Sequence, residues 1–213
     1  NDEDMVGLLA VEYRAGDTET ELSYLDVQEN FDPEIGFVPR SDSRRMKSSF
    51  RYRPRPDIPW IRMFSMGPRM TYLLDQGGDL QTRDVEVSLF TNLEIGDWIG
   101  IRLRDRYEYL DESFDIHEEI EVPAGEYRFT NVGLNLFASD ARRVSGSASA
   151  ETGQFFDGKR HRFSGELRYK FSGRLALESN YEVNRINLPA GNFTTNRWSN
   201  RFLYSFTPSF YIR

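Results

Sequence analysis

The chain contains no cysteine and only two histidines, His117 and His161, which lie on different segments. Neither disulfide bonds nor thiolate metal sites are therefore available, and two separated imidazoles do not make a zinc site. Lysine is limited to Lys47, Lys159 and Lys170, so arginine supplies nearly all of the positive charge. These absences predict a chain that binds no metal and no other cofactor.

Long hydrophobic runs are also missing. Mean hydropathy is −0.61, and no uninterrupted apolar run reaches the length of about 18 residues that a transmembrane helix needs. Membrane-spanning β-strands stay compatible with such values, because their lipid-facing and polar residues alternate and average out as hydrophilic. The formal net charge of −7 and the lack of nucleic-acid-binding motifs argue against a nucleic-acid partner.

What the chain does contain is alternation with a period of two. In "RHRFSGELRYKFSGRLALESNYEV" (160–183), Phe163 and Leu167 fall on one parity, and Arg162 and Glu166 fall on the other. This period indicates β-strands with one apolar and one polar face.

The same pattern divides most of the chain into strands, and no linker separates them into domains. We predict an all-β fold with a single domain over 1–213, an antiparallel up-and-down meander of about 11 long strands. The expected strands are 5–14, 19–28, 43–53, 59–74, 80–92, 97–110, 125–138, 143–155, 160–171, 174–186 and 193–206.

Strand length and loop length favour a membrane barrel over a soluble sandwich. Most of the segments exceed the 5–6 residues or so of an ordinary strand, and membrane-spanning strands need about 9–11. Several connections are short, such as "AGDT" and "EIGD", whereas 29–42 and 111–124 are long. Short turns at one end and long loops at the other are typical of outer-membrane barrels. Alternation by itself fits both architectures.

In a barrel the polar parity would line the lumen. Its predicted members on the strands are Arg51, Arg53, Arg102, Arg104, Arg106, Glu108, Arg162, Glu166, Arg168, Glu178, Glu182, Arg197 and Arg201. Two interpretations of this set stay open. The wall is either basic and attracts anions, or its arginines are neutralised in a ladder of ion pairs with carboxylates.

Four patches resemble an uncharacterised outer-membrane barrel domain of Gram-negative bacteria. They are "ENFDPEIGFVPRSDSRR" (29–45), "GGDLQTRDVEV" (77–87), "VPAGEYRF" (122–129) and "LPAGNFTTNRWSNRFLYSFTPSF" (188–210), which occur in the family's order. In the first patch the matching positions are Phe31, Pro33, Glu34, Gly36, Phe37 and Arg40. In that family the barrel follows a module similar to family-nine carbohydrate-binding domains, which this chain lacks.

The resemblance implies location in the bacterial outer membrane, lipid as a partner, and glycan as a second partner through the missing N-terminal module. The expected role is a transport or anchoring element of a surface glycan-handling protein. The alternatives are a soluble carbohydrate-binding β-sandwich and the barrel of a glycan-active hydrolase. The matched motifs mark turns and strands, so the resemblance assigns no catalytic residue.

Three local features have either a purely structural or a functional interpretation. The 31–40 loop is either a structural turn or a binding or constricting loop. The acidic stretch "LDESFDIHEEIEVPAG" (110–125) is interpreted as a solvated mobile loop rather than a calcium site, and His117 as a loop residue. Glu166 and Glu178 are interpreted as ladder members rather than a glycosidase pair, so no catalytic constellation and no enzymatic activity are predicted.

Two expectations concern geometry. A three-residue turn at 171–173 would place Arg162 opposite Glu182 and Phe163 opposite Tyr181. An odd number of strands does not close a bacterial barrel, so we expect a segment that is incomplete at both ends, an open and curved meander whose first and last edges are unpaired.

Overall fold

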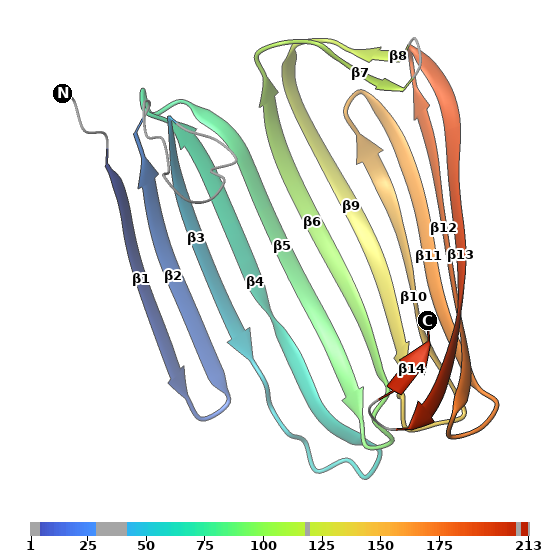
Figure 1. Ribbon diagram of the computed structural model, residues 1–213. Helices are drawn as coiled ribbons and strands as arrows, with labels where there is room; N and C mark the ends of the chain where they lie inside the picture. The colour runs from blue at the N-terminus through green and yellow to red at the C-terminus, as the bar shows by residue number, and fades with distance from the viewer. Residues whose placement is uncertain (1–4, 29–41, 118–119, 208–209, 213) are drawn as a thin grey trace.

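The computed structural model describes residues 5–28, 42–117, 120–207 and 210–212. Twelve strands form one antiparallel sheet in chain order, and two further strands form a separate hairpin (Figure 1). The strands are β1 (Val6–Ala15), β2 (Thr18–Val27), β3 (Ser43–Tyr52), β4 (Ile61–Asp75), β5 (Leu80–Leu93), β6 (Trp98–Leu110), β7 (Phe114–His117), β8 (Ile120–Val122), β9 (Gly125–Ala138), β10 (Val144–Phe155), β11 (Gly158–Lys170), β12 (Leu175–Leu188), β13 (Gly191–Thr207) and β14 (Phe210–Ile212).

The predicted all-β meander is confirmed, and each of the eleven expected strands begins and ends within two residues of its observed bounds. The agreement follows from the period-two alternation, which continues through each strand and stops at the turn residues. The described part of the chain holds no helix long and apolar enough to span a lipid bilayer.

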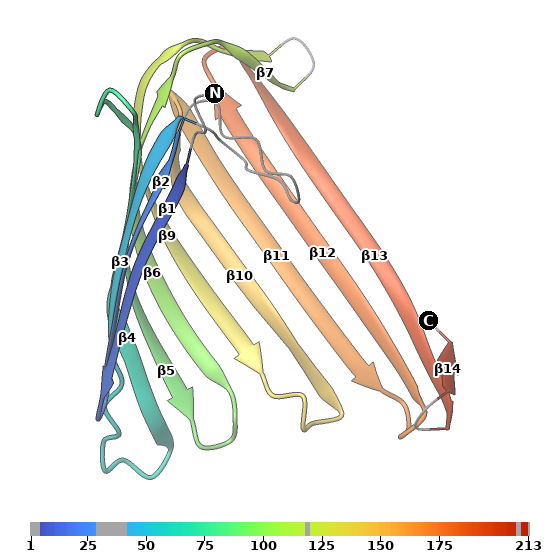
Figure 2. The ribbon, with the colours of Figure 1, turned by 60° about the vertical axis from the view of Figure 1, so that its left-hand side comes forward.

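The sheet is open and curved, as expected. Among the described residues β1 pairs only with β2 and β14 only with β13, so no hydrogen bonds join the two edges. The strands twist and curl into a trough (Figure 2). In Figure 1 the turns β1–β2, β5–β6, β9–β10 and β11–β12 lie at the lower end, and the β7–β8 hairpin lies at the upper end.

The register of the β11–β12 hairpin differs from the prediction by two residues. Arg162 pairs with Asn184 and Phe163 with Val183, because five residues, 171–175, separate the paired residues Lys170 and Ala176, whereas the prediction placed three between paired residues. The backbone N–H of Phe171 donates to the carbonyl of Leu175 at 2.9 Å and closes this longer turn. A shift of two residues keeps every side chain on its predicted face.

The two faces of the sheet have opposite character. Register places Leu134 on β9 beside Ala150 on β10 and Phe163 on β11, all on one face, which we call the apolar face. The other is the polar face, and it carries the charged parity of the strands. Among the described residues 32 large hydrophobic side chains are exposed and only seven hydrophobic residues are buried. The apolar side chains of this sheet are therefore not assembled into a core.

The largest buried cluster lies beneath the β7–β8 hairpin, which we call the cap. Ile120 and Val122 of the cap pack on Ile186 and Leu188 of β12, and all four are buried. Phe155 and Tyr127 also pack against the cluster, so the cap touches β9, β10 and β12. These partners stand at the upper ends of the polar face, and the cap therefore crosses the concave side of the trough (Figure 2).

The cap corrects the interpretation of 110–125 as a mobile acidic loop. His117 lies in β7, and its ring lies against the ring of Phe193 at a tilt of 30°, with centroids 4.4 Å apart. The acidic residues obscured an apolar alternation of Phe114, Ile116, Ile120 and Val122, which is the signal that could have identified the hairpin.

An ion pair joins two turns at the lower end. The Asp97 carboxylate accepts hydrogen bonds from the backbone N–H of Ser139 at 2.8 Å and from the Arg142 guanidinium. The Arg142 and Ser139 hydrogen bonds hold the pKa of Asp97 below its ordinary value. The β5–β6 turn is thereby tied to the β9–β10 turn.

The stability that Asp97 contributes should therefore depend on pH. A carboxyl whose pKa is lowered by folding stabilises the protein above its unfolded pKa, and this contribution disappears as the pH falls through the lowered value. We expect the Asp97→Asn variant to unfold more easily than the wild type at neutral pH. The difference should vanish in strong acid, as measured by denaturant unfolding across pH. A difference that persists unchanged in strong acid would contradict this role.

Candidate functional site

The thirteen side chains predicted to line a lumen share the polar face by register. They are spread over five strands or their immediate ends, namely β3, β6, β11, β12 and β13, and rows of paired residues connect them. One row runs from Glu86 on β5 to Arg104 on β6, and another from Arg168 on β11 through Glu178 on β12 to Arg201 on β13.

Two glutamates on β12 organise the charges at one side of the polar face. The carboxylate of Glu178, which is 9% exposed, forms ion pairs with Arg168 at 2.5 Å and with Arg201 at 3.5 Å. Glu182 receives Arg162 at 3.0 Å, and Arg197 lies 3.8 Å away. Glu182 is the diagonal neighbour of Arg162, so the expected ion pair forms although the direct pairing was wrong.

A second pair of carboxylates organises the opposite side. Arg104 donates to Asp84 through Nε at 2.8 Å, and Arg106 lies 3.9 Å from the same carboxylate. Glu19 on β2 accepts from Arg53 at 2.8 Å and from Arg51 at 3.4 Å. Arg106 is also 3.4 Å from Glu108. The ladder is thus the arrangement that the structure adopts for most of these arginines.

Sequence reasoning missed several members of this ladder. Glu19, Asp84 and Glu151 each bind at least one arginine, and Arg160 is the partner of Glu151. Their parity within the strands was visible, but their partners depend on which strands are neighbours and on the register between them. Arg83 lies on the apolar face, where it pairs with Asp105 near the upper end.

Each organising carboxylate is shared by two or three guanidinium groups, so the polar face keeps an excess of positive charge. Among the described residues, Arg69 on β4 and Arg102 on β6 have no carboxylate within ion-pair distance. Arg102 instead lies over the Phe90 ring, 5.5 Å from its centroid. These two guanidinium groups on β4 and β6 thus carry charge that no ion pair compensates.

The structure does not assemble a two-carboxylate reaction centre from Glu166 and Glu178. Arg168 and Arg201 hold Glu178 in the ladder, and Glu166 pairs in register with Asn180. Within the described ranges, no three His, Asp or Glu side chains group to hold a metal ion. The motif positions Phe31, Pro33, Glu34, Gly36, Phe37 and Arg40 lie outside the described residues.

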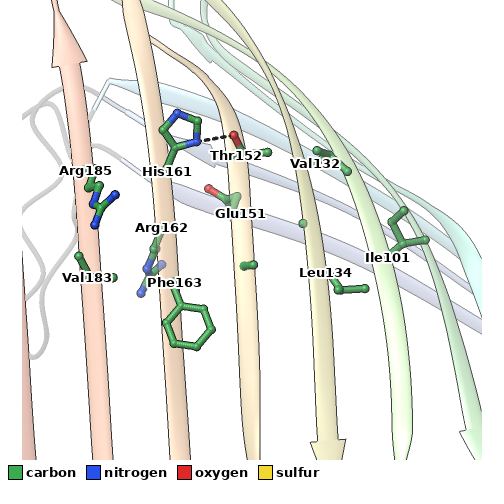
Figure 3. A pocket seen from close by; sticks show the side chains of 12 residues that line it. Ile101, Val132, Leu134, Glu151, Thr152, His161, Arg162, Phe163, Val183 and Arg185 are labelled. Atoms are coloured by element: carbon green, nitrogen blue, oxygen red, sulfur yellow. Dashed lines mark hydrogen bonds between the residues drawn. The ribbon is translucent and has the colours of Figure 1, made fainter.

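The apolar face carries a groove that no other described segment covers. The short side chain of Ala150 on β10 lies between Leu134 on β9 and Phe163 on β11, and it leaves a groove of about 510 Å³ (Figure 3). At its upper end the hydroxyl of Thr152 is 2.7 Å from Nδ1 of His161. Apolar side chains therefore give way to polar ones along this face.

Comparison of the chain with protein-family models, curated proteins and solved structures returns no match.

Proposed function

We propose that this chain is a β-barrel segment of a bacterial outer membrane, with its apolar face toward lipid and its polar face lining the interior. The observation that carries the proposal is the apolar face, whose exposed large hydrophobic side chains are distributed across the sheet from β1 to β13 while arginine–carboxylate ladders occupy the opposite face. A soluble protein rarely exposes a contiguous apolar patch larger than several hundred Å².

The distribution of side chains along the strands supports a lipid-facing belt. On β12, Leu177, Tyr181 and Val183 of the apolar face are followed toward the upper end by Arg185 and Asn187. The outer surface of a membrane barrel carries an apolar band about 25 Å tall, and polar residues bound this band. A sheet that covered a soluble core would have no reason to change character at this height.

Aromatic residues mark the lower border of the belt. Tyr169 and Phe171 at the end of β11 are in contact, with ring centroids 4.7 Å apart. Tyr204 and Phe206 make an equivalent pair at 4.7 Å near the end of β13. Amphipathic rings at the lipid–water boundary are a general feature of membrane barrels.

The biological role that we propose is a transport or anchoring element of a surface glycan-handling protein. The four motif patches support the link to glycans, and the charged concave face supports passage or binding of polar solutes. Strands of 10 to 17 residues support the membrane location, because they exceed the span of an ordinary soluble sheet.

Single-cysteine labelling tests the proposal, because the chain has no cysteine of its own. In the full-length protein in outer membranes, Ser149→Cys on the polar face should react with a small water-soluble maleimide. Leu134→Cys on the apolar face should stay protected until detergent or denaturant is added. These two positions lie on neighbouring strands, so they form a matched pair that differs in face.

Recovery of the full-length protein in the soluble periplasmic fraction without detergent would refute the membrane proposal. Equal labelling of the two cysteines in intact membranes would refute the assignment of the faces. A soluble β-sandwich predicts the first of these results.

A further inference from the structure

We propose that the polar face contains a binding site for an oxyanion, centred on a hollow between β3 and β6. This arginine hollow has a volume of about 350 Å³. Its polar-face lining includes Arg51, Ser65, Arg69, Glu86, Ser88 and Arg102. The inference rests on the proposed function and deepens it by naming the site and the chemistry of the solute.

The hollow exists because small residues occupy the middle of a row of long ones. Gly67 on β4 pairs with Ser88 on β5, and Ser88 pairs with Arg102 on β6. On the other side of Gly67 stands Arg51, whose Cα would lie 3.2 Å from a Cβ at position 67. Arg51 and Arg102 lie on strands that are three strand spacings of about 4.8 Å apart. Their backbones are therefore separated by roughly 14 Å across the bottom of the hollow.

Glycine is required at the floor of the hollow. A Cβ at position 67 would meet the backbone carbonyl oxygen of Phe50 at 1.9 Å, and a backbone atom cannot move aside as a flexible side chain does. The lack of a side chain at Gly67 thus allows β3 and β4 to approach closely and also leaves the space above this residue. No side chain larger than hydrogen can occupy this floor without displacing a strand.

Two of the three guanidinium groups around the hollow have no carboxylate partner among the described residues. In the described part of the chain, Arg69 and Arg102 have no ion-pair partner. Arg51 lies 3.4 Å from the Glu19 carboxylate, which also pairs with Arg53. Glu86 is the only carboxylate among the described lining residues. Three guanidiniums around one carboxylate leave an excess of positive charge and several unused N–H donors.

The position of Arg102 is supported from below. The Phe90 ring lies over Gly100, where a Cβ would come within 2.0 Å of the ring, and it contacts Trp98 edge-on at 5.4 Å. Arg102 in turn lies over Phe90. A guanidinium held by a packed ring loses less conformational entropy when it binds a ligand.

These features define the ligand class. Planar guanidinium groups recognise carboxylate, sulfate and phosphate through paired N–H donors. The hydroxyls of Ser65 and Ser88 add neutral hydrogen-bonding partners, and the volume exceeds the need of a bare anion. The hollow accordingly accepts the oxyanion group of a solute about as large as one sugar unit, or a free inorganic oxyanion.

Calorimetric titration of the purified full-length protein, from whichever cell fraction contains it, tests this site. The probes are glucuronate, inorganic phosphate and neutral glucose. We expect glucuronate or phosphate to bind and glucose not to bind. Arg69→Gln and Arg102→Gln should each lower the affinity for the anion about tenfold, because each removes a charge-assisted contact. Glucuronate alone binding identifies a sugar-borne anion, and equal binding of phosphate identifies recognition of the oxyanion alone.

Two further variants separate a built site from general electrostatic attraction. Arg160→Gln removes the same charge from the ladder on β11 and should leave anion binding within about twofold of the wild type. Ser88→Leu fills the hollow without changing charge and should abolish binding. Binding of neither anion, or equal losses in Arg69→Gln and Arg160→Gln, would overturn the site. Neither result depends on the outcome of membrane fractionation, which tests the barrel proposal separately.

Discussion

If the apolar face meets lipid as proposed, Leu134→Arg should lower the free energy of unfolding by about 2–4 kcal/mol, the cost of an arginine on the lipid-facing side of a barrel near the bilayer midplane. Leu134 is 44% exposed in the middle of the apolar stretch of β9, between Val132 and Leu136. In water, an exposed substitution of this kind changes stability by no more than about 0.5 kcal/mol. The size of the effect therefore distinguishes lipid from water as the surroundings of this face.

Thr194→Arg is the matched control for this prediction. Thr194 lies on the same face near the upper end of β13, where it is paired with Arg185. The cost of an arginine near the lipid–water boundary falls to about 0–1 kcal/mol, so we expect a small change. Urea unfolding of the full-length variants in phospholipid bilayers measures both values. Equally small effects at the two positions would show that water, and not lipid, surrounds the apolar face.

Val122→Asp should detach the cap from the sheet. Val122 is 1% exposed within the cluster that Ile120, Ile186 and Leu188 form, and no described basic side chain belongs to that cluster. An unpaired carboxylate in such surroundings costs several kcal/mol, more than a short hairpin can withstand. The expected result is loss of hydrogen-exchange protection in β7 and β8, while the amides of β9 to β12 stay protected.

Two variants accompany this experiment. Glu121→Lys changes an exposed neighbour on β8 and should leave protection of the cap unchanged. Val122→Thr keeps the shape of valine and buries one hydroxyl, so it should weaken protection by about 1–3 kcal/mol without releasing the hairpin. If the cap amides of Val122→Asp exchange as slowly as those of the wild type, the buried cluster does not hold the cap.

Burial of the cap also shows why its strands escaped sequence-based prediction. Its apolar positions are short and interrupted by acidic residues, and β7 and β8 contain only four and three residues. Such a segment has no stable structure of its own, because a two-stranded hairpin is marginal in water. It becomes ordered against Phe155, Ile186 and Phe193, residues that are distant in sequence.

The hairpin of β11 and β12 likewise shows which contacts the sequence could predict and which it could not. Alternation placed Arg162 and Glu182 on one face, and they form an ion pair at 3.0 Å. The direct partner of Arg162 is nevertheless Asn184, because five residues separate the paired Lys170 and Ala176 and the backbone N–H of Phe171 donates to the carbonyl of Leu175 within the turn. Turn geometry is a matter of a few local hydrogen bonds, and periodicity carries no information about them.

Sequence alone determined the eleven long strands of the main sheet and which of their side chains share a face, because the period of a strand is a local property of the backbone. It therefore assigned Arg102 and Arg168 to one face and Phe163 to the other. Only the tertiary structure decided the charge balance between arginines: Arg168 meets Glu178, whereas Arg102 meets the Phe90 ring beside a hollow above Gly67. Partners across strands depend on register and on close backbone approaches, which are set when the strands of the sheet pair.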